Sequence, residues 1–128
     1  MEIGGGAFYA TDLGGTLVIP AKVATIGASA FASTKLGGLD LSDATSLVEI
    51  GDEAFSGTDL GGTLVIPAKV TTIGNSAFQG TKFTGIDLSR VDLYNATSLK
   101  STWESAFFGT GLTAGMIVAP TNVPTYGV

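Results

Sequence analysis

The sequence lacks cysteine and histidine altogether, and these two absences remove most of the common catalytic and metal-binding chemistries. A Ser-His-Asp triad, a Cys-His pair and a zinc site with the usual ligands all need at least one of these side chains. Without cysteine there is also no disulfide framework to hold a small fold together. We therefore predict a protein that is not an enzyme and that needs no cofactor and no metal ion.

Charge is scarce as well, with six basic residues against eleven acidic ones and a net charge of −5. Proteins that bind nucleic acid or an anionic membrane surface do so through clustered Lys and Arg, which this composition does not supply. No apolar run approaches the ~20 residues that a membrane-spanning helix requires. We therefore expect no nucleic-acid partner and no membrane span.

Glycine, by contrast, is abundant, with 19 residues, and the chain repeats itself. The motif Ile-Gly-x-x-Ala-Phe occurs four times at intervals of 23, 24 and 23 residues, and a degraded fifth copy occupies residues 102–107. This period is typical of a solenoid, in which each coil buries its apolar face only against its neighbours. We predict a single solenoid over residues 1–128, with coils near 3–25, 26–49, 50–72, 73–101 and 102–128.

Within a coil, the stretch Thr16–Pro20 alternates as a β-strand does, so Leu17 and Ile19 should point inward and Val18 outward. Pro20 ends the strand because it has no N–H for the ladder. A second short extended segment is expected at Val23–Ile26. The rest of the coil has room only for a turn or a short 3₁₀ segment around Ala-Phe. The prediction is a β-rich fold of about five coils without long helices.

Aligned copies place like residues in columns, which a solenoid converts into ladders spaced about 4.8 Å apart. A threonine follows each Phe after three residues, and we expect its hydroxyl to bond the turn backbone. The Phe column is Phe8, Phe31, Phe55, Phe78 and Phe107, and the Thr column is Thr11, Thr34, Thr58, Thr81 and Thr110.

At these residues the chain resembles the BspA-like (Treponema pallidum type) leucine-rich repeat family. The residues that match its pattern are Leu17-Val18-Ile19-Pro20, Val23, Ile26-Gly27, Ala30-Phe31 and Leu36, whereas threonine stands in the family's cysteine column in every copy. The resemblance implies a leucine-rich-repeat solenoid that binds a protein or glycan partner, or mediates adhesion, rather than catalysing a reaction. It also implies an extracellular or cell-surface location, although no signal-peptide pattern precedes the first repeat in this chain.

A longer period of 47 residues lies on top of the coil period, because Asp12–Phe31 and Asp59–Phe78 differ at only two positions. Tandem duplication of a pair of coils explains it. Two columns alternate as a result. The residue after each Thr reads Asp12, Lys35, Asp59, Lys82 and Gly111, which predicts opposite charges on adjacent coils. The outward strand column reads Val18, Asp40, Val65, Asp87 and Val118.

The period breaks after the fourth copy, where the Phe78–Phe107 interval lengthens to 29 residues. Inserted residues in solenoids collect on one face and often carry recognition. Arg90, Tyr94 and Trp103 cluster at this break, and we predict that they contact a binding partner; the alternative is a capping irregularity. Asn95-Ala96-Thr97 matches the acceptor sequence for N-glycosylation, which has meaning in a secreted eukaryotic protein.

The two ends of the chain are out of phase by half a coil. The chain starts at the Ile-Gly motif without the preceding strand half, and it finishes with such a half. Head-to-tail stacking would complete both coils and generate an open filament. The alternative is a segment of a longer repeat protein. The residues predicted for such end-to-end contacts are Ile3, Phe8, Ile117, Val118 and Tyr126.

Overall fold

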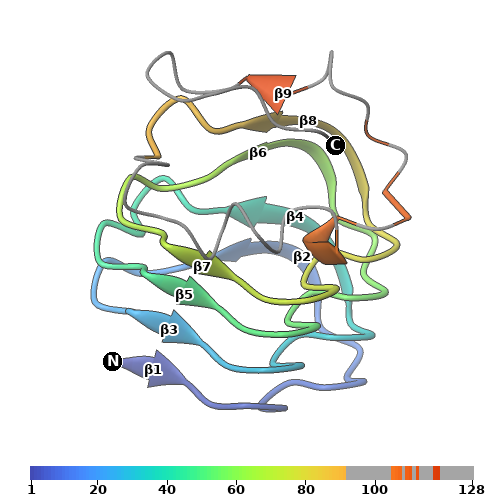
Figure 1. Ribbon diagram of the computed structural model, residues 1–128. Coiled ribbons are helices and arrows are strands. Elements are labelled where there is room, and N and C mark those ends of the chain that lie inside the picture. The colour runs from blue at the N-terminus through green and yellow to red at the C-terminus, as the bar shows by residue number, and fades with distance from the viewer. Residues whose placement is uncertain (92–104, 108, 111, 113–116, 119–128) are drawn as a thin grey trace.

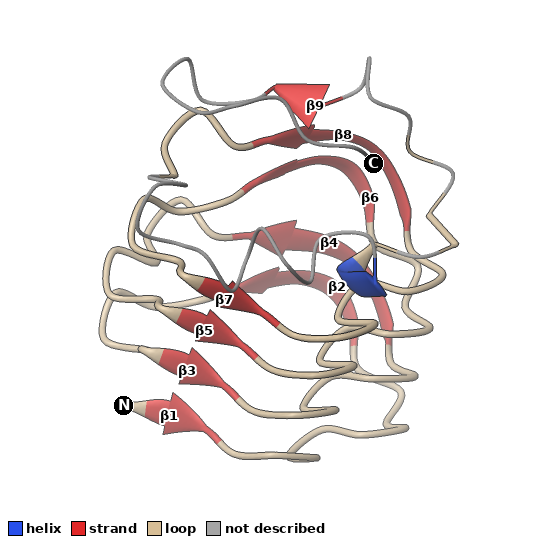
Figure 2. Ribbon diagram, in the orientation of Figure 1, coloured by secondary structure: helices blue, strands red, loops and turns tan. Residues whose placement is uncertain are grey.

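The protein was analysed as a computed structural model that describes residues 1–91, 105–107, 109, 110, 112, 117 and 118. The chain winds as a β-solenoid of about four turns, with strands on two opposite sides of the stack (Figure 1). Residues 105–106 are helical, and the rest of the described chain is strand, turn and loop (Figure 2). The predicted β-rich solenoid is confirmed, and most of the predicted fifth coil lies outside the described residues.

One side of the stack is a continuous parallel sheet of four short strands, in the order β1 (Glu2–Ile3), β3 (Thr25–Ile26), β5 (Glu49–Ile50) and β7 (Thr72–Ile73). Its register aligns Ile3 with Ile26, Ile26 with Ile50, and Ile50 with Ile73. The isoleucine of the repeat motif is therefore the inward ladder of this sheet, as the column alignment predicts. Only the last two residues of the predicted segment at Val23–Ile26 are in a strand.

The opposite side carries longer strands, which fall into two separate sheets (Figure 1). One sheet joins β2 (Gly14–Val18) to β4 (Lys35–Asp40), and the other joins β6 (Gly61–Val65), β8 (Lys82–Asp87) and β9 (Ile117–Val118). All of these pairs are parallel. The outward column is confirmed within each sheet, because Val18 pairs with Asp40, Val65 with Asp87, and Asp87 with Val118, but it is interrupted between Asp40 and Val65, which are not paired.

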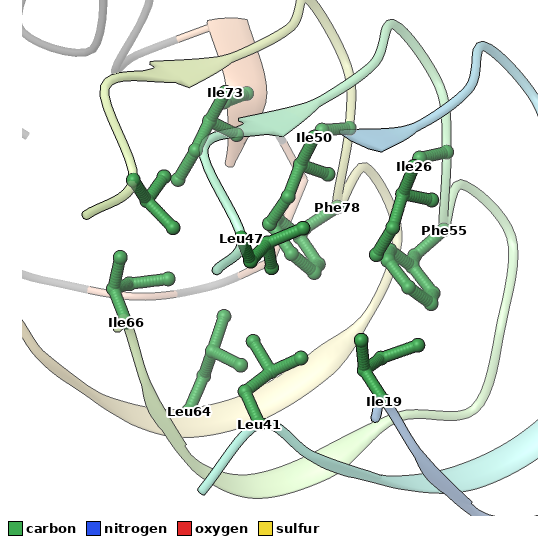
Figure 3. Packing of buried hydrophobic residues seen from close by; sticks show 14 of the residues in the cluster. Ile19, Ile26, Leu41, Leu47, Ile50, Phe55, Leu64, Ile66, Ile73 and Phe78 are labelled. Carbon is green, nitrogen blue, oxygen red and sulfur yellow. The ribbon is translucent and has the colours of Figure 1, made fainter. Parts of the chain in front are cut away.

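Between the two sides lies an apolar core built from the repeated columns (Figure 3). Neighbouring rings of the Phe column are stacked with centroids 5.1 to 5.4 Å apart and planes within 9° of parallel. Ile19, Leu41, Leu64 and Ile66 enter this core from the strands opposite, and Figure 3 shows them pointing toward Phe55 and the isoleucine ladder. Each coil thus buries its apolar residues against the coils above and below, as the repeat period requires.

The Ala-Phe turn holds the coils together through a further ladder of backbone hydrogen bonds. The Phe N–H of one coil donates to the Ala carbonyl of the next at 2.8 Å, from Phe8 to Ala30, Phe31 to Ala54, Phe55 to Ala77 and Phe78 to Ala106. Threonine closes the turn, since its hydroxyl donates to the preceding Phe carbonyl at 2.7 to 2.9 Å. The hydroxyl bond predicted for this column is confirmed.

Two residues in each of the first four turns have left-handed backbone conformations, and the fifth turn has only the second of them. The first immediately precedes Ala and the second lies two residues after Phe. Gly6, Ser29, Glu53 and Ser76 form the first column, and Ala10, Ser33, Gly57, Gly80 and Gly109 form the second. Both columns have φ between 56° and 76°. The turn is thus the same in successive coils even where the residue is not glycine.

Candidate functional site

A cleft of about 550 Å³ opens between β4 and β6, on the side of the solenoid that carries the two separate sheets. The coils on either side of it are firmly joined elsewhere, by the β3–β5 pairing and by the Phe31–Ala54 hydrogen bond. Near the start of the two strands the Asp59 N–H donates to the Leu36 carbonyl at 3.1 Å. Beyond this bond no backbone hydrogen bond joins β4 to β6, although both strands lie entirely within the described residues.

The backbone groups that face the cleft follow from the bonds on the other edges of the two strands. Neighbouring residues of a parallel strand point their N–H and C=O groups to opposite edges. The Asp40 carbonyl accepts from Ile19 of the first coil, so Leu39 and the Leu41 N–H face β6. The Ile66 N–H donates to Asp87 of the fourth coil, so Thr63 and Val65 face β4. Leu39, Leu41, Thr63 and Val65 all line the cleft.

The cleft has an apolar lining with polar groups at its margin. Leu39, Ala44 and Pro67 contribute apolar surface, and Thr45 and Thr63 contribute hydroxyl groups. Leu39 is only half-buried, whereas Ile86, which occupies the corresponding place in the fourth coil, is 1% exposed. The difference arises because β9 covers the edge of β8, while nothing among residues 1–91 covers the same edge of β4.

Charges of both signs stand at the margin of the cleft. Oδ1 of Asp40 accepts hydrogen bonds from the Ser42 hydroxyl at 2.6 Å and from the Ser42 backbone N–H at 2.9 Å. These bonds hold the pKa of the Asp40 carboxyl below its ordinary value, so Asp40 is ionised at neutral pH. Lys69 and Arg90 supply positive charge from the third and fourth coils.

Lys69 and Arg90 form no ion pair within 4.0 Å with the described part of the chain, although the charge of Arg90 helps to lower the pKa of the Asp87 carboxyl. Among the described residues, one ion pair meets the distance criterion, between Lys82 and Asp59 at 3.1 Å, and it is exposed. It is a member of the alternating charge column and lies away from the cleft lining. Lys69 and Arg90 are therefore positioned to meet a negative group on a partner.

Of the residues predicted for partner binding, the structure places Arg90 at the cleft. Tyr94, Trp103 and the glycosylation candidate Asn95 lie outside the described residues, so their roles stay predictions. Sequence reasoning did not identify the cleft or Lys69. The sequence does contain a signal of the cleft in one column of core residues. These residues are Ile19, Leu41, Ile66 and Leu88, and the intervals between them are 22, 25 and 22 residues. The 25-residue interval from Leu41 to Ile66 falls where β4 and β6 are not paired.

The residues predicted for end-to-end contacts have different environments. Phe8 stacks on Phe31 with centroids 5.1 Å apart and is 42% exposed, whereas Ile3 is partly buried in β1. Ile117 and Val118 form β9 and pair with β8 of the same chain. Tyr126 lies outside the described residues.

Acidic metal-binding clusters and membrane-spanning helices are absent from the part of the chain that the structure describes. It contains no group of three or more acidic residues close enough to hold a metal ion. None of its helical residues belongs to a helix that is long and apolar enough to cross a bilayer. The cleft is consequently the site on which the functional argument rests.

A stack of short parallel strands with inward ladders of Leu, Ile and Phe defines a leucine-rich-repeat solenoid. The sequence matches the family model for the BspA type leucine rich repeat region, in six copies over residues 1–126, and the chain belongs to that family. The family predicted from the repeat motif is confirmed, with one copy more than the five coils expected. Members of the family are generally not enzymes, commonly bind proteins or mediate adhesion, and are often associated with the cell surface. Neither a curated protein nor a solved structure matches the chain.

Proposed function

We propose that this chain is a non-enzymatic binding module that attaches to a protein or glycan partner at a cell surface, and that the cleft between β4 and β6 is its contact site. The facing edges of β4 and β6, which are not paired with any strand of the described residues, carry this proposal, because exposed strand edges readily accept a partner. Family membership supports the general class of function. The extracellular location is part of the proposal.

The proposal is tested by adhesion of particles coated with the chain to defined surfaces of extracellular-matrix proteins and of glycans. The test variant replaces both cleft cations, Lys69→Ala with Arg90→Ala. The 47-residue duplication supplies the control Lys22→Ala, because Lys22 is the duplicate of Lys69 and does not line the cleft. We expect adhesion to at least one surface, reduced in the double variant and retained in the control. Absence of adhesion to every surface would contradict the proposed function.

A second candidate function is a structural subunit that assembles end to end, and the exposure of the first coil favours it. Met1, Phe8 and Tyr9 are 75%, 42% and 58% exposed, which leaves one face of the Phe8 ring open to a further stacked ring. Light scattering over a wide range of concentration tests this candidate. Growth of the particle mass with concentration, reduced by Phe8→Ser, supports it, and a monomer at the highest concentration excludes it.

A further inference from the structure

We propose that the cleft binds an extended peptide, which adds as a strand to the open edges of β4 and β6 and places an acidic side chain against Lys69 and Arg90. This inference rests on the proposed function, since it names the chemistry of the partner at that same site.

The molecule itself shows what the free edge of an even-numbered coil accepts. β8 and β4 are duplicates 47 residues apart, so Ile86 and Asp87 correspond to Leu39 and Asp40. On β8, these two residues pair with Ile117 and Val118 of β9 in parallel register. On β4, the corresponding edge has no strand from the described residues. A peptide on β4 would occupy the place that β9 occupies on β8.

The opposite wall of the cleft offers a second row of backbone groups. Thr63 and Val65 direct their N–H and C=O groups toward β4, as the pairing of Ile66 with Asp87 requires. An extended peptide alternates donors and acceptors on both of its edges, which matches two facing strand edges. Those backbone groups favour a peptide over a sugar, and the lining residues that the structure describes include no aromatic ring.

Size and charge restrict the peptide further. The cleft volume of about 550 Å³ lies within the range of about 300–1,000 Å³ typical of small-ligand sites, so it holds a few extended residues and not a folded domain. Lys69 and Arg90 both line the cleft and come from the third and fourth coils, whereas Asp40 on the β4 side is already bonded to Ser42. The favoured peptide therefore carries an acidic side chain directed toward the β6 side.

The experiment starts from a displayed library of random peptides of about ten residues, a length that spans about 33 Å when extended. The library is selected on the wild-type chain, and enriched peptides are synthesised for fluorescence-anisotropy titration. Each is also made with N-methyl groups on alternate backbone nitrogens, which removes strand hydrogen bonds without changing the side chains. We expect enrichment of acidic, β-prone sequences. N-methylation can be placed on the odd-numbered or on the even-numbered backbone nitrogens of a peptide, and one of these two patterns should weaken binding by at least about tenfold.

The matched variants are Val65→Pro and Val18→Pro. Val65 directs its N–H into the cleft, so proline there removes a cleft donor without removing a bond to β8. Val18 is its duplicate in β2 and directs its N–H away from β4, outside the cleft. Val65→Pro should weaken the enriched peptides by at least about tenfold, and Val18→Pro should leave them unchanged. The titrations with N-methylated peptides use the wild-type chain and do not depend on the folding of either variant.

Three results would overturn the inference. The first is that no peptide is enriched, and the second is that both N-methylation patterns leave the affinity of a peptide unchanged. The third is that an enriched peptide binds the wild type and folded Val65→Pro with equal affinity. Selective binding of a glycan that Val65→Pro abolishes would also overturn it, because the cleft would then take a sugar. Adhesion that persists in Val65→Pro separates the two proposals, since the chain would remain a binding module whose contact lies elsewhere.

Discussion

At the scale of single residues, the Phe column carries much of the cohesion between coils. Phe31, Phe55 and Phe78 are each at most 1% exposed and stack on a ring above and below. Parallel stacked rings at this spacing add to the free energy of burial. Phe8 belongs to the same column but has a ring on one side only among the described residues.

We expect Phe55→Ala to lower the free energy of unfolding by about 3–5 kcal/mol, because it leaves a cavity in the middle of the stack. The matched change Phe8→Ala should cost less, about 1–2 kcal/mol, since that ring is already partly exposed. Urea unfolding followed by circular dichroism measures both. Equal losses at the two positions would show that the column does not act through burial.

At the scale of the structural element, the turn repeats its backbone conformation while its residues change. Left-handed φ is unfavourable for residues with a Cβ atom, and glycine adopts it without that penalty. The second left-handed column contains Gly57, Gly80 and Gly109, but Ala10 and Ser33 stand at the equivalent positions of the first two coils. Some turns are therefore locally strained and are held by the hydrogen bonds to the adjacent coil.

Ser33→Gly should raise the free energy of unfolding by about 0.5–1 kcal/mol, because it relieves a φ of 58° at an exposed position. Ser33→Ala serves as the control, since it removes the hydroxyl but retains the Cβ atom. Urea midpoints determined at unchanged m-value measure both changes. A gain in the alanine variant as large as that in the glycine variant would assign the effect to the hydroxyl group instead.

How much of the turn and the cleft could be predicted follows from the chemistry of each column. The isoleucine and phenylalanine ladders were predictable because identical apolar side chains at a constant period have one way to be buried together. The left-handed columns were not, because they mix Gly, Ser, Glu and Ala, which share no side-chain chemistry. The cleft was also hidden, since the 25-residue step from Leu41 to Ile66 is visible only once both are known to be core residues.

At the scale of the whole molecule, the described coils form one stack with three kinds of connection between neighbours. The β1–β3–β5–β7 sheet and the Ala-Phe turns run through the described coils without interruption, whereas the opposite side is divided between β4 and β6. The core is nevertheless continuous across this division, because Leu41 and Ile66 are both buried in the same cluster. The cleft is thus a local opening in a cohesive solenoid.

Amide hydrogen exchange measured by NMR should reveal this division along a single strand. We expect the Ile66 amide, bonded to Asp87, to exchange slowly, and the adjacent Val65 amide, which faces the cleft, to exchange rapidly. The ratio should be roughly a hundredfold or more, which corresponds to about 3 kcal/mol. Similar protection at Val65 and Ile66 would mean that β4 and β6 are paired in solution.

The interruption between β4 and β6 also has a mechanical meaning. The second and third coils are tied along β3–β5 and at the Ala-Phe turn, but not along the two facing strands. A force that bends the solenoid so that the side with the two separate sheets is stretched meets the least resistance between β4 and β6. We therefore expect the molecule to bend at the β4–β6 interruption, and a strand bound there would stiffen it.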